Sequence, residues 1–268
     1  MKPIKSLGYR TDMIFRRFDA EIIERDDYTV VLTPSNPGFF WGNFLLFKEP
    51  PSNGSLAEWN EIFESEVASK LDVHHRAFGW DCTENVLGEH QVFLDAGYTL
   101  DQCVVQTAQS VHEPPKLNSD VEIRPLRGSE WDDVIEIQVA CTPERFQPHL
   151  YRQYRQERMI RYREMNKVGL GTWFGAFLDG QIVADLGIFS DDEIGRFQHV
   201  ETHPDFRRRA ICSTMIYESS RYAFEQMGVE TLVIAADVNY HAKEIYESVG
   251  FKPTEHQAGL QWFDPKYS

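Results

Sequence analysis

The sequence lacks the features that would place it in a membrane, secreted or disulfide-bonded class. Among its 268 residues no apolar run approaches the roughly 18 that a membrane helix needs. Its first ten residues lack the apolar stretch of a signal peptide, so a cytoplasmic location is expected. The cysteines form no C-x-x-C pair, which argues against a disulfide framework or a zinc site and predicts reduced thiols. They are Cys82, Cys103, Cys141 and Cys212.

Positive charge is also scarce. Lysine and arginine number 27 against 42 aspartates and glutamates, which gives a formal net charge of −15. A strongly acidic surface repels nucleic acid and anionic membranes and favours cationic partners. An anionic ligand would therefore need a local basic patch.

The clearest boundary in the chain is the polar, proline-containing segment His112–Asp120, which is typical of a linker. It divides the sequence into expected domains of residues 1–117 and 118–268. In the second, predicted strands and helices alternate, as in an α/β domain of about 150 residues. Strands are predicted over residues 121–126, 172–178, 181–189, 193–202, 231–236, 251–256 and 260–263. Helices are predicted over residues 129–141, 148–166, 212–227 and 242–249.

Two local signals support these elements. Asp179-Gly180 predicts a hairpin turn between two strands. Ser129-Glu130-Trp131-Asp132 has the pattern of a capping box at a helix start.

The first half carries weaker elements of the same kind. Strands are predicted over residues 28–33, 39–47, 76–80 and 99–106, and helices over 55–68, with a capping box at Ser55, and 86–96. Phe93–Tyr98 parallels Tyr246–Phe251, because each places an aromatic residue in a helix before Gly-aromatic and a strand. Two explanations remain open: a duplication, or the usual glycine at a helix end.

Three adjacent arginines follow a predicted strand that stops at Pro204. Arg207, Arg208 and Arg209 precede a predicted helix. A helix N-terminus presents unpaired N–H groups and partial positive charge, and neighbouring arginines strengthen its attraction for phosphate. The pattern predicts a phosphate site; an exposed basic loop is the alternative.

This segment resembles motif A of the GNAT N-acetyltransferase superfamily, in which a strand leads into a loop of the form Arg/Gln-x-x-Gly-x-Gly/Ala that opens a helix. The resemblance implies that the backbone of Val200, Glu201 and Thr202 pairs with the pantetheine arm of coenzyme A. It also implies that the loop holds the pyrophosphate, through Arg207, Arg208, Arg209, Ala210, Ile211, Cys212 and Ser213. Ala210 and Cys212 depart from the family pattern, and the methyl group of Ala210 is tolerated if the backbone there is helical.

A second segment, Asn239–Phe251, is similar to the family's motif B, Asn-x-x-Ala-x-x-Leu/Phe-Tyr-x-x-x-Gly-Phe. The two motifs together imply the mixed α/β GNAT fold, with the first half as a degenerate copy in tandem. Tyr246 occupies the position of the family's proton donor; the alternative is a core aromatic. Asn239 is expected to cap the helix or to contact coenzyme A. Phe93 has no hydroxyl group, so the first half is not expected to bind coenzyme A.

Glu201 is the best candidate for the base that deprotonates an amine, because a carboxylate in such a cleft can have a raised pKa. The alternative is an ordinary surface carboxylate. His199 and His203 are weaker candidates, on the same face as Glu201 if the strand is regular. These three residues are not expected to bind a metal, because the cofactor arm should occupy that strand edge.

The predicted helix over residues 148–166 is rich in arginine and tyrosine. Arg152, Arg155, Arg158, Arg161 and Arg163 alternate with three tyrosines. RNA binding is one reading of this pattern, but the acidic chain favours a solvated helix face whose arginines pair with nearby acids. By its position in the family fold, this helix borders the acceptor site.

The expected function is transfer of an acetyl group from acetyl-coenzyme A to a primary amine of a small molecule or protein, without a metal. The alternative is a non-catalytic acyl-coenzyme A sensor or interaction module, and a third case is a fold that binds no cofactor. Neither nucleic acid nor membrane is an expected partner, and the sequence leaves a homodimer open.

Overall fold

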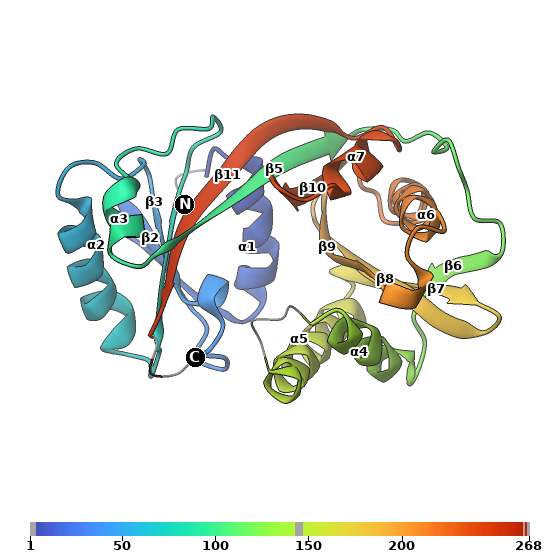
Figure 1. Ribbon diagram of the computed structural model, residues 1–268, viewed down its shortest axis with the longest axis horizontal. Coiled ribbons are helices and arrows are strands. Elements are labelled where there is room, and N and C mark those ends of the chain that lie inside the picture. Colours follow the sequence, from blue (N-terminus) through green and yellow to red (C-terminus); the bar gives the residue numbers. More distant parts are fainter. Residues whose placement is uncertain (1–3, 143–146, 265, 267–268) are drawn as a thin grey trace. The chain divides into compact units, whose positions relative to one another are not determined.

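A computed structural model of the chain describes residues 4–142, 147–264 and 266 (Figure 1). It divides into two compact units. The first unit comprises Met1–Val105, Ala235–Tyr240 and Pro253–Ser268, and the second comprises Gln106–Ile234 and His241–Lys252.

The first unit is built on strands in the order β1-β2-β3-β4-β11-β5. β3 and β4 are parallel, whereas β1 with β2, β2 with β3, and β4 with β11 are antiparallel. The strands are β1 (Glu21–Glu24), β2 (Tyr28–Leu32), β3 (Phe44–Phe47), β4 (His75–Trp80), β5 (Thr99–Ala108) and β11 (Lys252–Phe263). The helices are α1 (Leu7–Asp19), α2 (Ser55–Phe63) and α3 (Gln91–Asp95), with a 3₁₀ turn at Phe40–Gly42 and a π-helical turn at Glu64–Ala68 after α2.

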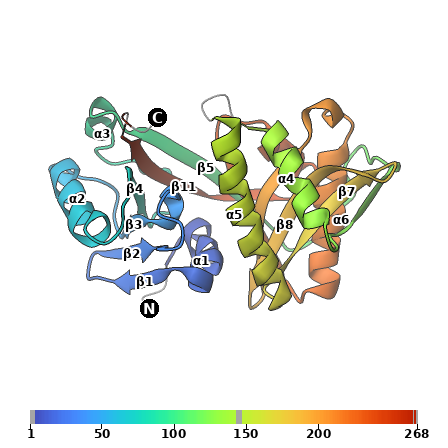
Figure 2. The same ribbon diagram turned by 90° about the horizontal axis from the view of Figure 1, so that it is seen from below.

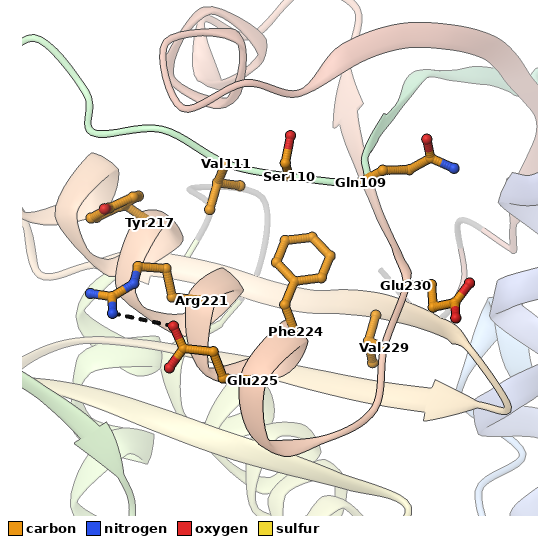
Figure 3. A pocket seen from close by; sticks show the side chains of 9 residues that line it. All are labelled: Gln109, Ser110, Val111, Tyr217, Arg221, Phe224, Glu225, Val229 and Glu230. Atoms are coloured by element: carbon orange, nitrogen blue, oxygen red, sulfur yellow. Dashed lines mark hydrogen bonds and ion pairs between the residues drawn. The ribbon is translucent and has the colours of Figure 1, made fainter.

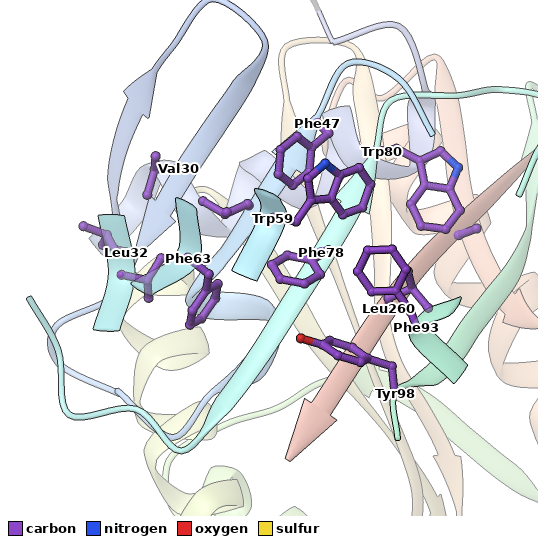
Figure 4. Packing of buried hydrophobic residues seen from close by; sticks show 13 residues of the cluster. Val30, Leu32, Phe47, Trp59, Phe63, Phe78, Trp80, Phe93, Tyr98 and Leu260 are labelled. Atoms are coloured by element: carbon purple, nitrogen blue, oxygen red, sulfur yellow. The ribbon is translucent and has the colours of Figure 1, made fainter. Parts of the chain in front are cut away.

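Alternation of side chains along the strands gives this sheet two apolar faces. Val30 and Leu32 join the cluster around Trp59 of α2, and Val31 between them joins the cluster around Tyr9 of α1. The sheet therefore lies between α1 and α2. The α2 side is filled with aromatic rings (Figure 4), including a stack of Phe47 on Trp59 with ring centres 3.9 Å apart.

The C-terminal strand differs from the expectation. In place of two strands over residues 251–256 and 260–263, the chain forms one strand, β11. From Pro253 onward it belongs to the first unit, where Leu260 of β11 pairs with Phe78 of β4. Ala258 and Leu260 complete the cluster around Trp59. The compact units therefore cross the expected boundary between residues 117 and 118, because β11 buries its apolar residues in the core of the first half.

The second unit has strands in the order β10-β9-β8-β7-β6, with β9 and β10 parallel and the other neighbours antiparallel. α4 and α5 lie on one face of the strands and α6 on the other (Figures 1 and 2). The strands are β6 (Val121–Pro125), β7 (Gly171–Leu178), β8 (Gln181–Asp191), β9 (Ile194–Thr202) and β10 (Thr231–Asp237). The helices are α4 (Glu130–Ala140), α5 (Pro148–Lys167), α6 (Ile211–Gln226) and α7 (Ala242–Glu247), with a 3₁₀ turn at Pro204–Phe206.

Most predicted elements of this unit are confirmed, including the β7–β8 hairpin with Asp179 and Gly180 at φ +51° and +80°. The predicted capping box at the start of α4 is wrong, because Ser129 makes no side-chain cap bond. The Glu130 carboxylate instead accepts the Arg127 N–H at 2.6 Å and pairs with Arg124 at 2.7 Å.

Candidate active site

Strand β9 has an open edge. It pairs with β8 through Thr202, but its pairing with β10 ends where Arg196 faces Val233. From Phe197 to Thr202, the residues that the structure describes place no second strand of this unit beside it. The backbone N–H and C=O groups on that edge can therefore pair with an extended ligand, as an added strand would.

A bulge interrupts β9 in the same stretch. Asp185 of β8 faces Glu201, and Gly187 faces Gln198, so two residues of β9 oppose one of β8. His199 in this bulge has φ +54°, a conformation that costs a non-glycine residue about 1–3 kcal/mol. The strand is therefore not regular, which was the condition for placing His199 and His203 on the same face as Glu201. Bulges of this kind are frequent beside active sites.

The bulge brings His199 and Glu201 together, with Nε2 and Oε1 3.1 Å apart. Burial alone would raise the pKa of Glu201, but attraction to His199 and Arg155 leaves it below its usual value. The predicted raised pKa of Glu201 is therefore wrong. His203 lies beyond the end of β9 and accepts the Asp205 N–H through Nδ1. Within the described part of the chain, no three His, Cys, Asp or Glu side chains form a metal-binding group.

Sequence reasoning missed Asp185, which faces Glu201 across the sheet. Its side chain is fully buried, and its Oδ2 accepts hydrogen bonds from Gln138 at 2.7 Å and Trp173 at 3.0 Å. Burial and the charge of Glu201 raise the pKa of Asp185 to about 8. The available signal was an aspartate at a buried position within an otherwise apolar strand.

The arginine-rich helix is only partly the solvated face that was expected. Arg152 forms the expected ion pair, with Glu136. Arg155 and Arg158, however, are 3% and 4% exposed. Arg155 donates to Gln138 at 2.8 Å, and Arg158 bonds the Tyr162 hydroxyl. These two arginines face the interior and are unavailable to RNA.

The loop after β9 is tied back to the strand by its first arginine. Arg207 donates through Nε to the Thr202 carbonyl at 3.1 Å and lies 3.5 Å from the Cys141 sulfur. The segment predicted as a linker also contributes, because the Asn118 side chain donates to the Arg209 carbonyl at 2.9 Å. The loop is therefore held at both ends.

The N-terminus of α6 is open. Its first helical bond runs from the Thr214 N–H to the Ala210 carbonyl at 3.1 Å, so the N–H groups of Ile211, Cys212 and Ser213 have no acceptor within the helix. Burial raises the pKa of the Cys212 thiol to about 12, which keeps it neutral.

Two exposed arginines flank these N–H groups. Arg208 and Arg209 are exposed, and no described residue forms an ion pair with Arg208. Arg208 and Ala210 have φ +64° and +58°, so the backbone at Ala210 is left-handed and the condition for tolerating its methyl group, a helical backbone, is not met. The loop has the left-handed backbone that glycine adopts most easily, although no glycine is present.

Aromatic rings connect motif B with β9. Tyr246 of α7 is 5% exposed and meets Phe251 edge-on at 6.5 Å. Phe251 in turn meets Phe197 of β9 at 5.7 Å. Gly250 has φ +116°, where a side chain would be strained. This places Tyr246 in a packed cluster next to the open strand.

The expected capping role of Asn239 is wrong. The residue before α7 is His241, which makes no side-chain cap bond. Asn239 is exposed and its N–H donates to the Asp237 carboxylate at 2.8 Å. It belongs to the first unit, so its contact with coenzyme A stays a prediction.

A separate pocket lies along the second half of α6 (Figure 3). It includes Tyr217, Phe224 and Val229, and its one arginine, Arg221, is paired with Glu225 at 3.2 Å. This pocket has no free positive charge for an anion and lies away from the α6 N-terminus. No described helix is both long and apolar enough to span a membrane.

Comparison with known proteins identifies the unit that carries this strand and loop. A family model described as "Acetyltransferase (GNAT) family" matches residues 131–251. Those residues belong to the GNAT family. None of the curated proteins matches the sequence.

Solved structures extend the similarity in fold over both halves of the chain. A functionally unknown conserved protein from Staphylococcus epidermidis ATCC 12228 has a TM-score of 0.74 at 17% identity, over 91% of this chain and 94% of that one. A GCN5-related N-acetyltransferase from Kribbella flavida has a TM-score of 0.64 at 12% identity, over 97% and 96%. A tandem GNAT protein from the clavulanic acid biosynthesis pathway has a TM-score of 0.54 at 11% identity, over 91% and 82%. The predicted α/β GNAT fold is confirmed, and the family supports an acyltransferase type of function.

Proposed function

We propose that the GNAT domain transfers an acetyl group from acetyl-coenzyme A to a primary amine of a small molecule or protein. The observation that carries this proposal is the continuity of two binding features. The unpaired edge of β9, Phe197–Thr202, is followed by a loop of eight residues and then by the open N-terminus of α6, which begins at Ile211. An extended arm that ends in a pyrophosphate would match both features.

The residues present fit such a ligand. The N–H groups of Ile211, Cys212 and Ser213 with the side chains of Arg208 and Arg209 would hold the pyrophosphate. Arg207 is a weaker candidate than predicted, because its guanidinium already bonds the Thr202 carbonyl. Val200 and the N–H group of Thr202 offer strand-edge backbone to the pantetheine arm.

Acetyl-coenzyme A would supply the acetyl group as a thioester. An ammonium with a pKa near ~10.4 must first lose a proton, and Glu201 is the one acidic residue of the open strand β9. The neutral nitrogen then forms the C–N bond as the C–S bond breaks. Tyr246 would give its hydroxyl proton to the departing sulfur and recover one from the nitrogen. The acidic chain, at −15, favours a cationic acceptor.

The alternative is a non-catalytic acyl-coenzyme A sensor or interaction module. It is favoured by the loop itself, where Ala210 keeps a methyl group in a left-handed conformation beside the open N–H groups. A sensor needs binding without turnover, so a strained loop and a buried tyrosine would not count against it.

Calorimetric titration with acetyl-coenzyme A, followed by assays of a panel of primary amines as acceptors, tests both the transferase and the sensor hypothesis. We expect binding, thiol release with at least one amine, and a loss of turnover on the order of a hundredfold in Tyr246→Phe with affinity retained. Tyr222→Phe, which removes a hydroxyl from α6 instead, serves as the control. Binding without turnover in the unaltered protein would favour the sensor, and no heat at millimolar ligand would exclude both.

A further inference from the structure

Two carboxyl groups lie close together where the proposed base, Glu201, is located. Asp185 and Glu201 are direct partners across β8 and β9. Such partners point to the same face, with Cβ atoms about 4.5–5.5 Å apart. Asp185 is 0% exposed, and the Glu201 side chain is 19% exposed.

Each carboxyl group has one buried oxygen without a hydrogen-bond partner. Among the residues that the structure describes, Asp185 Oδ1 and Glu201 Oε2 have none. Leaving two such oxygens buried and both groups ionised is costly, because each ion loses its hydration next to a like charge. A single proton between them would satisfy both oxygens.

Neighbouring donors determine which oxygen carries that proton. Oδ2 of Asp185 receives N–H groups from Gln138 and Trp173, so it acts as an acceptor only. The Gln138 amide is oriented by Arg155, whose Nε donates to its oxygen at 2.8 Å. A proton on Asp185 must therefore lie on Oδ1, the oxygen left for Glu201.

We propose that Asp185 and Glu201 share one proton, and that the pair, once it has lost this proton, is the base that deprotonates the acceptor amine. Asp185 is thus a positioning residue that acts through Glu201. The amine step rests on the proposed acetyl transfer, whereas the shared proton does not. In that step an N–H bond of the ammonium breaks, an O–H bond forms on the pair, and the proton leaves to solvent between turnovers.

Titratable groups around the pair support this division of roles. Arg155 faces it from α5, His199 from β9, and the Cys141 thiol from the end of α4. Burial and Glu201 raise the pKa of Asp185 to about 8, whereas the pKa of Glu201 is below its usual value. The shared proton is therefore held mainly by Asp185. A base that takes up a proton near pH 8 is also stronger than an isolated Glu201.

Carbon-13 NMR of the protein labelled at the aspartate carboxyl carbons tests the shared proton without any ligand. We expect one resonance, absent in Asp185→Asn, to titrate near pH 8 and to shift to lower pH in Glu201→Gln. A resonance that titrates near the usual ~3.9, or one that Glu201→Gln leaves in place, would overturn the pair. Because Glu201→Gln keeps Asp185, this test stands even if Asp185→Asn does not fold.

Activity measurements then test the role of the pair as a base. With acetyl-coenzyme A and the amine that the panel identifies, Asp185→Asn should lower kcat about ten- to a hundredfold. It should also abolish the rise of kcat between pH 7 and 9 and leave the KM for acetyl-coenzyme A unchanged. Asp191→Asn, at the exposed end of the same strand, is the matched control. An unaltered pH profile in Asp185→Asn would overturn the role of the pair as a base. Titration near pH 8 without acetylation of any amine would overturn both that role and the proposed function.

Discussion

Replacing Ala210 by glycine tests the strain in the loop before α6. Ala210 has φ +58° and ψ +14°, and a left-handed conformation costs a residue other than glycine about 1–2 kcal/mol. Glycine at this position would remove that cost. It would also make the unfolded chain more flexible, which offsets the gain in stability by about 0.4–1 kcal/mol. The difference between the two central values predicts that Ala210→Gly stabilises the protein by about 0.8 kcal/mol.

Thermal unfolding is the assay for this change. For a unit of this size, 0.8 kcal/mol corresponds to a rise in Tm of about 2–3 °C. The control is Ala140→Gly at the exposed end of α4, where glycine replaces a right-handed residue and should destabilise by about 0.5–1 kcal/mol. A Tm of Ala210→Gly equal to or below that of the unaltered protein would refute the reasoning, because strain at this residue could not then be present.

Three other changes probe the basic loop, the buried acid and the strand β11. Replacing Arg208 and Arg209 together by alanine should weaken coenzyme A binding by about tenfold or more and reduce its salt dependence in calorimetry, whereas Arg221→Ala should do neither. Asp185 stays protonated in the folded state up to about pH 8. The free energy of unfolding should therefore fall by up to about 1.4 kcal/mol per pH unit as the pH rises from about 4 to 8. Urea unfolding of Asp185→Asn should not show this fall. Ending the chain at Lys252 should abolish amide protection in the first unit while the second keeps it, as measured by hydrogen exchange.

Each of these has a clear contrary outcome. An unchanged salt dependence would remove the two arginines from the binding site. An identical pH dependence of stability in the aspartate variant and its parent would mean that this carboxyl group is ionised at neutral pH. Protection of the first unit after truncation would show that β11 is not needed for its core.

Local sequence patterns predicted most elements of the fold, and they failed where the stabilising partner is distant. The helix α1 was missed because its N-terminus is capped from elsewhere. Asp81 accepts the N–H groups of Lys5 and Ser6, and Glu255 accepts that of Leu7. These acceptors lie 75 or more residues away in the sequence, so no local capping pattern precedes the helix.

The candidate site shows the same division. The basic loop and Glu201 could be proposed from the sequence because motif and charge are contiguous there. The roles of Asp185 and Arg155 were missed, because their partners lie on another strand and another helix. The bulge at His199 could not be predicted either, since it changes the register of β9 without any glycine or proline to mark it.

Two helices, α2 after β3 and α6 after β9, follow a strand that has a parallel neighbour. Their N-termini differ in a way that bears on function. At α6 the first N–H groups are open and arginines flank them. At α2 the preceding loop is covered by its own chain: the Glu89 N–H donates to the Pro51 carbonyl at 2.7 Å, and a side chain on Gly88 would come within 2.1 Å of that oxygen. Phe93, which parallels Tyr246, is fully buried against Trp59 (Figure 4). In the first half, packing fills the space that a ligand would need, so the proposed catalysis belongs to the second half alone.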